Sequence, residues 1–296
     1  MTRRIITGII ITLVLLAVAR RLSMNNSEAL LSSSGGVTVT HSTVFEQVGR
    51  EMPVLTVRVE PADGAHAYLV YRVQGEDMSG RGDQDNDETA GSDNIVKVEM
   101  TAGENGTFSG NLPDLEKGNR LGYAFEVEVK DEESGQQERL RLPEIEGSFL
   151  TLKYKGEVST LVLILHVIFM FGAFFFMVES GLCAIPVFKG AEGKEMTAVM
   201  MRWLILFTFV GGWPLGFILN YQRFGPIWEG FPFGYDITDN KTQLMLVIWA
   251  ITVLLSLGSF FGKGEEKDKL GRKGFAIAVL VSTILSFLIF LIPHSL

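Results

Sequence analysis

The sequence predicts an integral membrane protein in which an all-β domain is inserted between an N-terminal apolar helix and an α-helical transmembrane bundle. Three observations support this fold class. Four apolar segments in the second half are each long enough to cross a bilayer, which takes about 20 helical residues. The stretch from residue 36 to 158 alternates apolar and polar residues, as half-buried strands do. It carries 24 acidic and 12 basic residues, a net charge of −12, so the remaining chain contributes +4 to the total of −8.

Charge and cysteine content exclude several classes of protein. An acidic polar domain would repel phosphate, so we expect no binding of nucleic acid. The single cysteine, Cys183, cannot form an internal disulfide or a cysteine-ligated zinc or iron–sulfur site. The sequence also lacks a phosphate-binding glycine loop, a nucleophile elbow and a paired-histidine metal motif. These absences favour a protein without catalytic activity.

Residues 1–22 are expected to act as an export signal. Their apolar run over residues 5–19 reaches the upper limit of a signal-peptide core and is shorter than a full span. Small residues at the end of this run resemble a cleavage site, but Arg20 and Arg21 follow it directly, where positive charge hinders processing. The segment is therefore either an uncleaved signal-anchor helix or a signal peptide, and a polar linker follows over residues 23–36.

Residues 37–157 are expected to form a two-sheet β-sandwich. About seven short segments alternate apolar and polar residues, among them 53–60, 67–73, 95–100 and 123–129. Turn residues such as Asp63-Gly64 and Asn105-Gly106 separate these segments. Short strands at this spacing are typical of sandwich folds.

The stretch from Tyr71 to Gly135 resembles the immunoglobulin/fibronectin-III-like modules of bacterial envelope proteins. The similar features are a Tyr-Arg-Val strand, the segment 106–113, and a turn at Gly118 that leads into a Tyr/Phe strand ending at Asp131. The resemblance covers about a fifth of the chain. It implies an Ig-like sandwich and brings no catalytic residue with it.

Residues 158–296 are expected to form a transmembrane domain of four helices. The predicted spans cover about 159–182, 198–220, 242–261 and 274–293. The loops after the first and third spans carry seven Lys or Arg residues, against two in the loop between them. Because basic loops stay in the cytoplasm, the β domain is expected on the periplasmic side of a cell (inner) membrane.

Two histidines of the transmembrane domain are candidate cofactor ligands. His166 lies about eight residues into the first of the four spans, and His294 follows the last one. A polar side chain at membrane depth needs a partner, and neutral imidazole is a good ligand for haem iron. Haem b or a quinone is therefore a candidate cofactor. A hydrogen bond from His166 to a neighbouring helix is the structural alternative, because the two histidines are expected at different depths.

Glu179 and Arg202 are the other charged residues inside the predicted spans. Antiparallel neighbouring helices would bring them to a similar depth, where an ion pair offsets much of the cost of burying each charge. We therefore expect an intramembrane ion pair between them. The functional alternative is a proton-relay role for Glu179 near a quinone pocket. The segment from Gly211 to Pro214 lies in the same predicted span as Arg202 and predicts a kink.

The loop 221–242, called here the aromatic loop, is the most distinctive segment of the sequence. It contains six Trp, Phe or Tyr residues together with Gly-Pro turns. Two compatible interpretations are an interfacial aromatic belt and a docking surface for a partner protein or an amphipathic ligand such as quinone. The expected docking residues are Trp228, Phe231, Phe233, Tyr235 and Asp236. Thr238 or Asp239 is expected to cap the helix that follows.

One acidic segment of the β domain resembles the start of a calcium-binding loop. Asp83, Asp85 and Asp87 place carboxylates at alternate positions. The glycine expected next is Glu88, and the twelfth position is Asn94 rather than glutamate. A solvated acidic loop is therefore the favoured interpretation.

The sequence thus favours a non-catalytic accessory subunit of a multi-protein envelope complex, with a respiratory or electron-transfer complex as the leading context. Its partners would be other membrane subunits and the lipid bilayer, docked through the β-sandwich and the aromatic loop. The first alternative is a subunit that interacts with haem b or quinone through His166. The second is a small-solute transporter, for which the sequence offers neither internal repeats nor paired broken helices.

Overall fold

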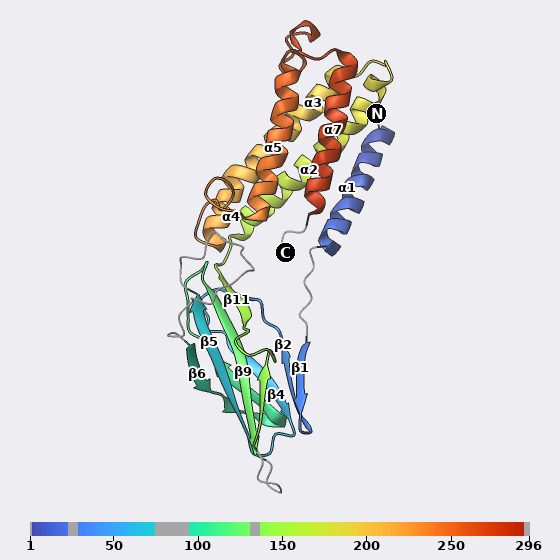
Figure 1. Ribbon diagram of the computed structural model, residues 1–296. Coiled ribbons are helices and arrows are strands. Elements are labelled where there is room, and N and C mark those ends of the chain that lie inside the picture. The colour runs from blue at the N-terminus through green and yellow to red at the C-terminus, as the bar shows by residue number, and fades with distance from the viewer. Residues whose placement is uncertain (1, 23–28, 75–94, 131–136, 293–296) are drawn as a thin grey trace. The chain divides into compact units, whose positions relative to one another are not determined.

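The computed structural model describes residues 2–22, 29–74, 95–130 and 137–292, which form two compact units (Figure 1). The helical unit comprises Met1–Met24, Val158–Tyr221 and Pro226–Leu296. The β unit comprises Asn25–Glu157 together with Gln222–Gly225. The β unit therefore includes four residues that the sequence analysis assigned to the aromatic loop.

The β unit contains two β-sheets. The first sheet has the order β1-β2-β4-β8-β7, from strands Ala29–Ser34, Val37–Ser42, Val54–Glu60, Thr107–Asn111 and Thr101–Ala102. The second has the order β3-β11-β9-β5-β6, from Glu46–Val48, Leu150–Lys155, Arg120–Lys130, Ala65–Gln74 and Ile95–Glu99. Strand β10 (Gln137–Leu142) pairs with β9. Among the described strands only β3 and β11 pair in parallel.

Alternation along the strands builds one apolar core between the two sheets. In β4 the side chains of Leu55, Val57 and Val59 are at most 1% exposed, while their neighbours along the strand are exposed. They belong to the same buried cluster as Leu121 and Phe125 of β9 in the other sheet. The structure thus confirms that this region is all β and that its strands form two sheets.

A histidine lies inside this apolar core. Burial lowers the pKa of His41, so the neutral ring is favoured. Its Nδ1 donates to the carbonyl of Thr56 over 2.7 Å, and its Nε2 lies 3.1 Å from the hydroxyl of Tyr123. That hydroxyl also accepts from the amide of Val44 over 3.0 Å. The network gives both nitrogens of the buried His41 ring a polar partner.

The helical unit contains α1 (Thr2–Leu22), α2 (Thr160–Phe188), α3 (Lys194–Val210), α4 (Gly216–Arg223), α5 (Ile237–Leu255), α6 (Leu257–Phe260) and α7 (Arg272–Leu291). Helix α2 packs against α1, α3 and α7, and α5 packs against α7 (Figure 1). Their shared core includes Phe174, Met177, Met201, Trp249 and Phe275.

Three of the described helices are long and apolar enough to cross a membrane, which fits a membrane protein. They are α2 (Thr160–Phe188), the continuous helical stretch Lys194–Arg223 that contains α3 and α4, and α7 (Arg272–Leu291). The segment predicted as a span over 242–261 is divided instead. Helix α5 begins at Ile237 with polar residues in its first turns and ends at Leu255, and a break at Ser256 separates it from the short α6. Because of this polar start and the break, α5 lacks a stretch that is as long and as apolar as those of the other three helices.

Candidate functional site

Four residues near the start of the aromatic loop belong to the β unit, and the rest of the loop belongs to the helical unit. Residues 222–225 pack within the β unit, where the amide of Gly156 donates to the carbonyl of Arg223 over 2.8 Å. The guanidinium of Arg223 lies 3.5 Å from the carboxylate of Glu46. A side chain at Gly118 could not be accommodated, because its Cβ would lie 2.3 Å from the carbonyl oxygen of Phe224. This segment is therefore a fitted part of the β unit.

A buried carboxylate organises the rest of the loop inside the helical unit. The Asp239 side chain is 8% exposed and accepts from the amide of Glu229 over 2.8 Å. The Nδ2 of Asn220, in α4, lies 3.1 and 3.2 Å from its two oxygens. The helix cap is Asp236, whose carboxylate accepts from the amide of Asp239 over 2.9 Å, so the predicted cap at Thr238 or Asp239 was wrong. Asp239 instead ties the loop to two helices.

The predicted kink between Gly211 and Pro214 takes the form of a π-helical turn over Gly211–Leu215. The carbonyl of Gly211 accepts from the amide of Gly216, five residues on. His166 Nδ1 lies 3.0 Å from the same carbonyl oxygen. Because a carbonyl can only accept, Nδ1 carries the proton and Nε2 carries the lone pair of the neutral ring. His166 thus supports the distorted turn, which agrees with the structural alternative for this residue.

The π-helical turn presents Trp213 to the rings of the loop. Trp213 lies 6.0 Å from Trp228 between ring centroids, with an interplanar angle of 18°. Phe217 meets Trp228 edge-on at 5.8 Å. A cavity of about 560 Å³ adjoins this cluster, lined by Trp213, Phe217, Pro226, Ile227, Trp228, Phe233 and Gln243. The lining is almost entirely apolar, and Gln243 adds one neutral amide.

The five predicted docking residues have different surroundings. Phe231, Phe233 and Tyr235 are 63%, 82% and 76% exposed, so their rings are available on the surface of the loop. Trp228 is half-buried in the ring cluster, and Asp236 is exposed but serves as the helix cap. The structure therefore separates three exposed rings from two residues that hold the loop in shape.

Glu179 has a different ionic partner from the predicted one. Its carboxylate Oε2 accepts from Nε of Arg4, in α1, over 3.0 Å, and its side chain is 1% exposed. Arg202 is exposed, and its Nε donates to the carbonyl of Ala198 over 3.4 Å. The ion pair expected between Glu179 and Arg202 is therefore replaced by one between Glu179 and Arg4. Antiparallel packing of α2 and α3 was a sound expectation, but the N-terminal helix supplies the nearer charge.

Two further candidates fall outside the described residues, namely His294 and the acidic triplet Asp83, Asp85 and Asp87. Within the described residues, no group of three or more His, Cys, Asp or Glu side chains could hold a metal ion. The cofactor role of His166 stays a prediction.

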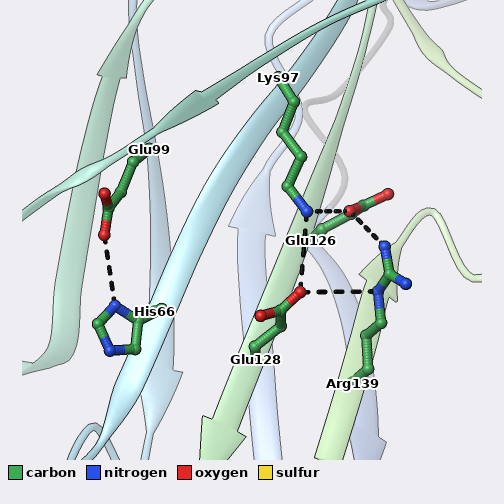
Figure 2. Close-up of polar contacts among 6 residues, drawn as sticks. All are labelled: His66, Lys97, Glu99, Glu126, Glu128 and Arg139. Atoms are coloured by element: carbon green, nitrogen blue, oxygen red, sulfur yellow. Dashed lines mark hydrogen bonds and ion pairs between the residues drawn. The ribbon is translucent and has the colours of Figure 1, made fainter.

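The exposed side of the second sheet carries a self-paired polar network, shown in Figure 2. Glu126, on β9, lies 2.7 Å from Lys97 Nζ and 2.8 Å from Arg139 Nη2. Glu128 lies beside the same two cations at 3.8 and 4.0 Å. Burial raises the pKa of Glu126, but the hydrogen bonds from Lys97 and Arg139 outweigh it, so the net pKa lies below its usual value. The network satisfies its own charges and offers no free catalytic group.

No family model matches the chain, and no curated protein is similar to it at a significant level.

Proposed function

We propose that the protein is a non-catalytic membrane subunit of a larger envelope assembly, which binds partner proteins through the exposed rings of the aromatic loop and through the β unit. One observation carries this proposal. Phe231, Phe233 and Tyr235 expose most of their surface within five residues of chain. Burying one such ring at an interface contributes about 1.5–3 kcal/mol.

The way the loop is held adds to this argument. The amide of Phe231 donates to Asn240 Oδ1 over 2.7 Å, and Asp239 fixes the backbone at Glu229. Because these bonds order the loop before any partner arrives, little conformational entropy remains to be lost on docking. Rigid aromatic anchors of this kind dominate the energy of many interfaces.

Four finer features belong to the same proposal. The β unit would be an Ig-like module, supported by its two sheets and shared core. Helix α5 with α6 would be a fourth span, supported by its packing along α7. The basic loops favour a β unit on the periplasmic side of the inner membrane. A respiratory or electron-transfer complex is the proposed context.

Co-purification of partners tests the proposal. The variant Phe231→Ser/Tyr235→Ser removes two exposed rings and neither lines the cavity. We expect it to lose the partners that co-purify with the wild-type protein in mild detergent, because each ring contributes about 2 kcal/mol or more to such an interface. The matched control is Phe261→Ser, which removes a 58% exposed ring from the segment after α6.

Folding of each variant is checked with a thiol-reactive dye. Cys183 is the single cysteine of the chain and is 4% exposed, so it reacts only when the helical unit opens. If the double variant is folded and keeps every partner that Phe261→Ser keeps, the docking function is wrong and the rings form only an interfacial belt.

A further inference from the structure

The cavity beside the π-helical turn has the size of a small-molecule site. It is an open hollow on the surface of the helical unit, and its volume of about 560 Å³ falls within the range of about 300–1,000 Å³ found for ligand pockets. Trp213 and Phe217 come from the helix around the turn, Trp228 and Phe233 from the loop, and Gln243 from α5. Three successive segments of the chain thus contribute to one concave site.

Close packing positions the turn against α5. A Cβ at Gly212 would lie 2.7 Å from Cγ2 of Thr242, so the turn approaches this closely only because residue 212 is glycine. Gln243 follows Thr242 directly in α5. A π-helical turn is rare, and such turns occur frequently at functional sites. The distortion therefore aims Trp213 at the cavity where the side chain of Gln243 also lies.

The lining selects for a class of ligand. Four aromatic rings favour a planar ring compound through stacking and edge contacts. No Lys, Arg, Asp or Glu lines the cavity among the described residues, so a charged ligand would be left without a counter-charge. A quaternary ammonium group would need rings closing around it, whereas Trp213 and Trp228 lie nearly parallel and in contact. The ligand expected here is neutral and planar.

Gln243 adds hydrogen-bonding chemistry to this site. Its side-chain amide has no hydrogen-bond partner within the part of the chain that the structure describes. An amide donates through its NH₂ group and accepts through its oxygen. It can therefore bind a carbonyl oxygen, and it can equally bind the hydroxyl that replaces that oxygen in a reduced ring.

We propose that this cavity binds a neutral, planar, carbonyl-bearing ring compound that dissolves in the bilayer, which is the chemistry of the membrane quinones. The ring packs against the side chains of Trp213, Trp228 and Phe233 that line the cavity, and its carbonyl accepts from the amide of Gln243. Phe233 is shared with the proposed docking surface, but Phe231 and Tyr235 lie outside the lining, so the two functions can be tested separately.

Tryptophan fluorescence measures binding directly. The purified full-length protein in lipid nanodiscs is titrated with a benzoquinone carrying a ten-carbon tail, which quenches tryptophan on contact. We expect a saturable quench that is lost in Trp213→Phe/Trp228→Phe. Trp203→Phe is the matched control, because Trp203 lies in α3 outside the lining and should leave the affinity unchanged.

A second variant tests the hydrogen bond. Gln243→Leu should weaken binding about threefold to tenfold, the range for losing one neutral hydrogen bond. Decanol, which has the tail without the ring, should compete poorly. A quench that never saturates, or that is the same in every variant, overturns the proposal. Equal competition by decanol also overturns it and assigns the cavity to acyl chains. The variant Phe231→Ser/Tyr235→Ser distinguishes ligand binding from partner docking. If the two functions are separate, this variant loses its partners while its quenching by the quinone stays unchanged.

Discussion

Two ion pairs in the helical unit each stabilise a buried carboxylate, and they differ in how many groups support it. Lys194 and Asp268 have side chains 3% and 0% exposed, with Nζ and Oδ2 2.7 Å apart. Ser259 donates its amide to Asp268 Oδ1 over 2.8 Å and its hydroxyl to Oδ2, and Glu265 lies 3.7 Å from Lys194. Both oxygens of the buried carboxylate are therefore satisfied, Oδ1 by one hydrogen bond and Oδ2 by two.

The pair between Arg4 and Glu179 is built with far less support. Arg4 contacts Oε2 of Glu179, whereas the buried Oε1 has no hydrogen-bond partner among the described residues. A Cβ at Gly8 would lie 2.1 Å from that oxygen, so α1 passes against it with no room to spare. A buried carboxylate with one ionic partner depends entirely on that partner. The pair between Lys194 and Asp268 is therefore reinforced by Ser259 and Glu265 near Asp268. The pair between Arg4 and Glu179 has no such support within the described part of the chain and exists only as long as α1 stays in place.

The largest effect is expected for Arg4→Leu. It leaves a charge on Glu179 that is both buried and unpaired, which costs about 3–5 kcal/mol. The thermal midpoint of dye labelling at Cys183 in detergent should therefore fall strongly. Cys183 lies one helical turn beyond Glu179, so it reports on this region directly.

Two comparisons sharpen that prediction. Arg3→Leu removes the neighbouring exposed arginine and should leave the midpoint unchanged. Gly8→Ala should destabilise by about 1–3 kcal/mol, because the added methyl displaces the carboxylate from Arg4. Equal midpoints for Arg4→Leu and Arg3→Leu would show that the pair does not hold α1 in the bundle.

A smaller effect is expected for Lys194→Met. Asp268 keeps its bonds from Ser259, so the expected loss at neutral pH is about 2–3 kcal/mol. Burial raises the pKa of Asp268, but the bonds from Lys194 and Ser259 outweigh it and lower the pKa below its usual value. A carboxylate with a lowered pKa stabilises the fold above its unfolded pKa, and this stability is lost as the pH falls through the folded pKa.

The difference in stability between Lys194→Met and wild type should therefore shrink as the pH falls from about 4, the usual aspartate pKa, through the lower folded pKa of Asp268. Thermal unfolding followed by tryptophan fluorescence measures it at each pH. Asp268→Asn is the control and should show a flatter profile than wild type. A difference that stays constant over this range would contradict an ionised Asp268.

The smallest effect is expected on the exposed sheet of the β unit. Glu126→Gln weakens contacts to Lys97 and Arg139, whose side chains are 39% and 62% exposed. Exposed pairs contribute about 0.2–1 kcal/mol, and salt screens them. Hydrogen exchange of the β9 amides should therefore rise only slightly, and the difference from wild type should vanish at high salt. A loss of stability as large as that of Lys194→Met would mean that solvent does not screen the charges of this network.

Periodicity predicts much of the fold because it is local. The alternation in 54–60 places three side chains in the core, and the apolar runs at 160–188 and 272–291 form helices long and apolar enough to cross a membrane. The kink at Pro214 follows from proline chemistry within a helix. Each of these features depends on neighbours a few residues away.

The contacts that the sequence analysis missed are long-range. Arg4 and Glu179 are 175 residues apart, and Lys194 and Asp268 are 74 apart. The sequence shows that Glu179 needs a cation but not which one, since Arg202 was equally plausible by depth. Asp239 was predicted only as a cap, although Asn220 and the glycines of the loop before it (Gly225, Gly230 and Gly234) are features that could have indicated a buried anchor.

Residues 222–225 have a consequence for how the chain is made. The β unit contains Gln222–Gly225 as well as Asn25–Glu157, yet two long apolar helices are encoded between those segments. When residue 157 leaves the ribosome, Gly156 still lacks Arg223 as its backbone acceptor and Glu46 still lacks its guanidinium. The last pieces of the sheet domain arrive only after α2 and α3 have been synthesised. A chain that stalls between these helices therefore lacks both the backbone bond at Gly156 and the ion pair from Arg223 to Glu46, so its β unit is incomplete.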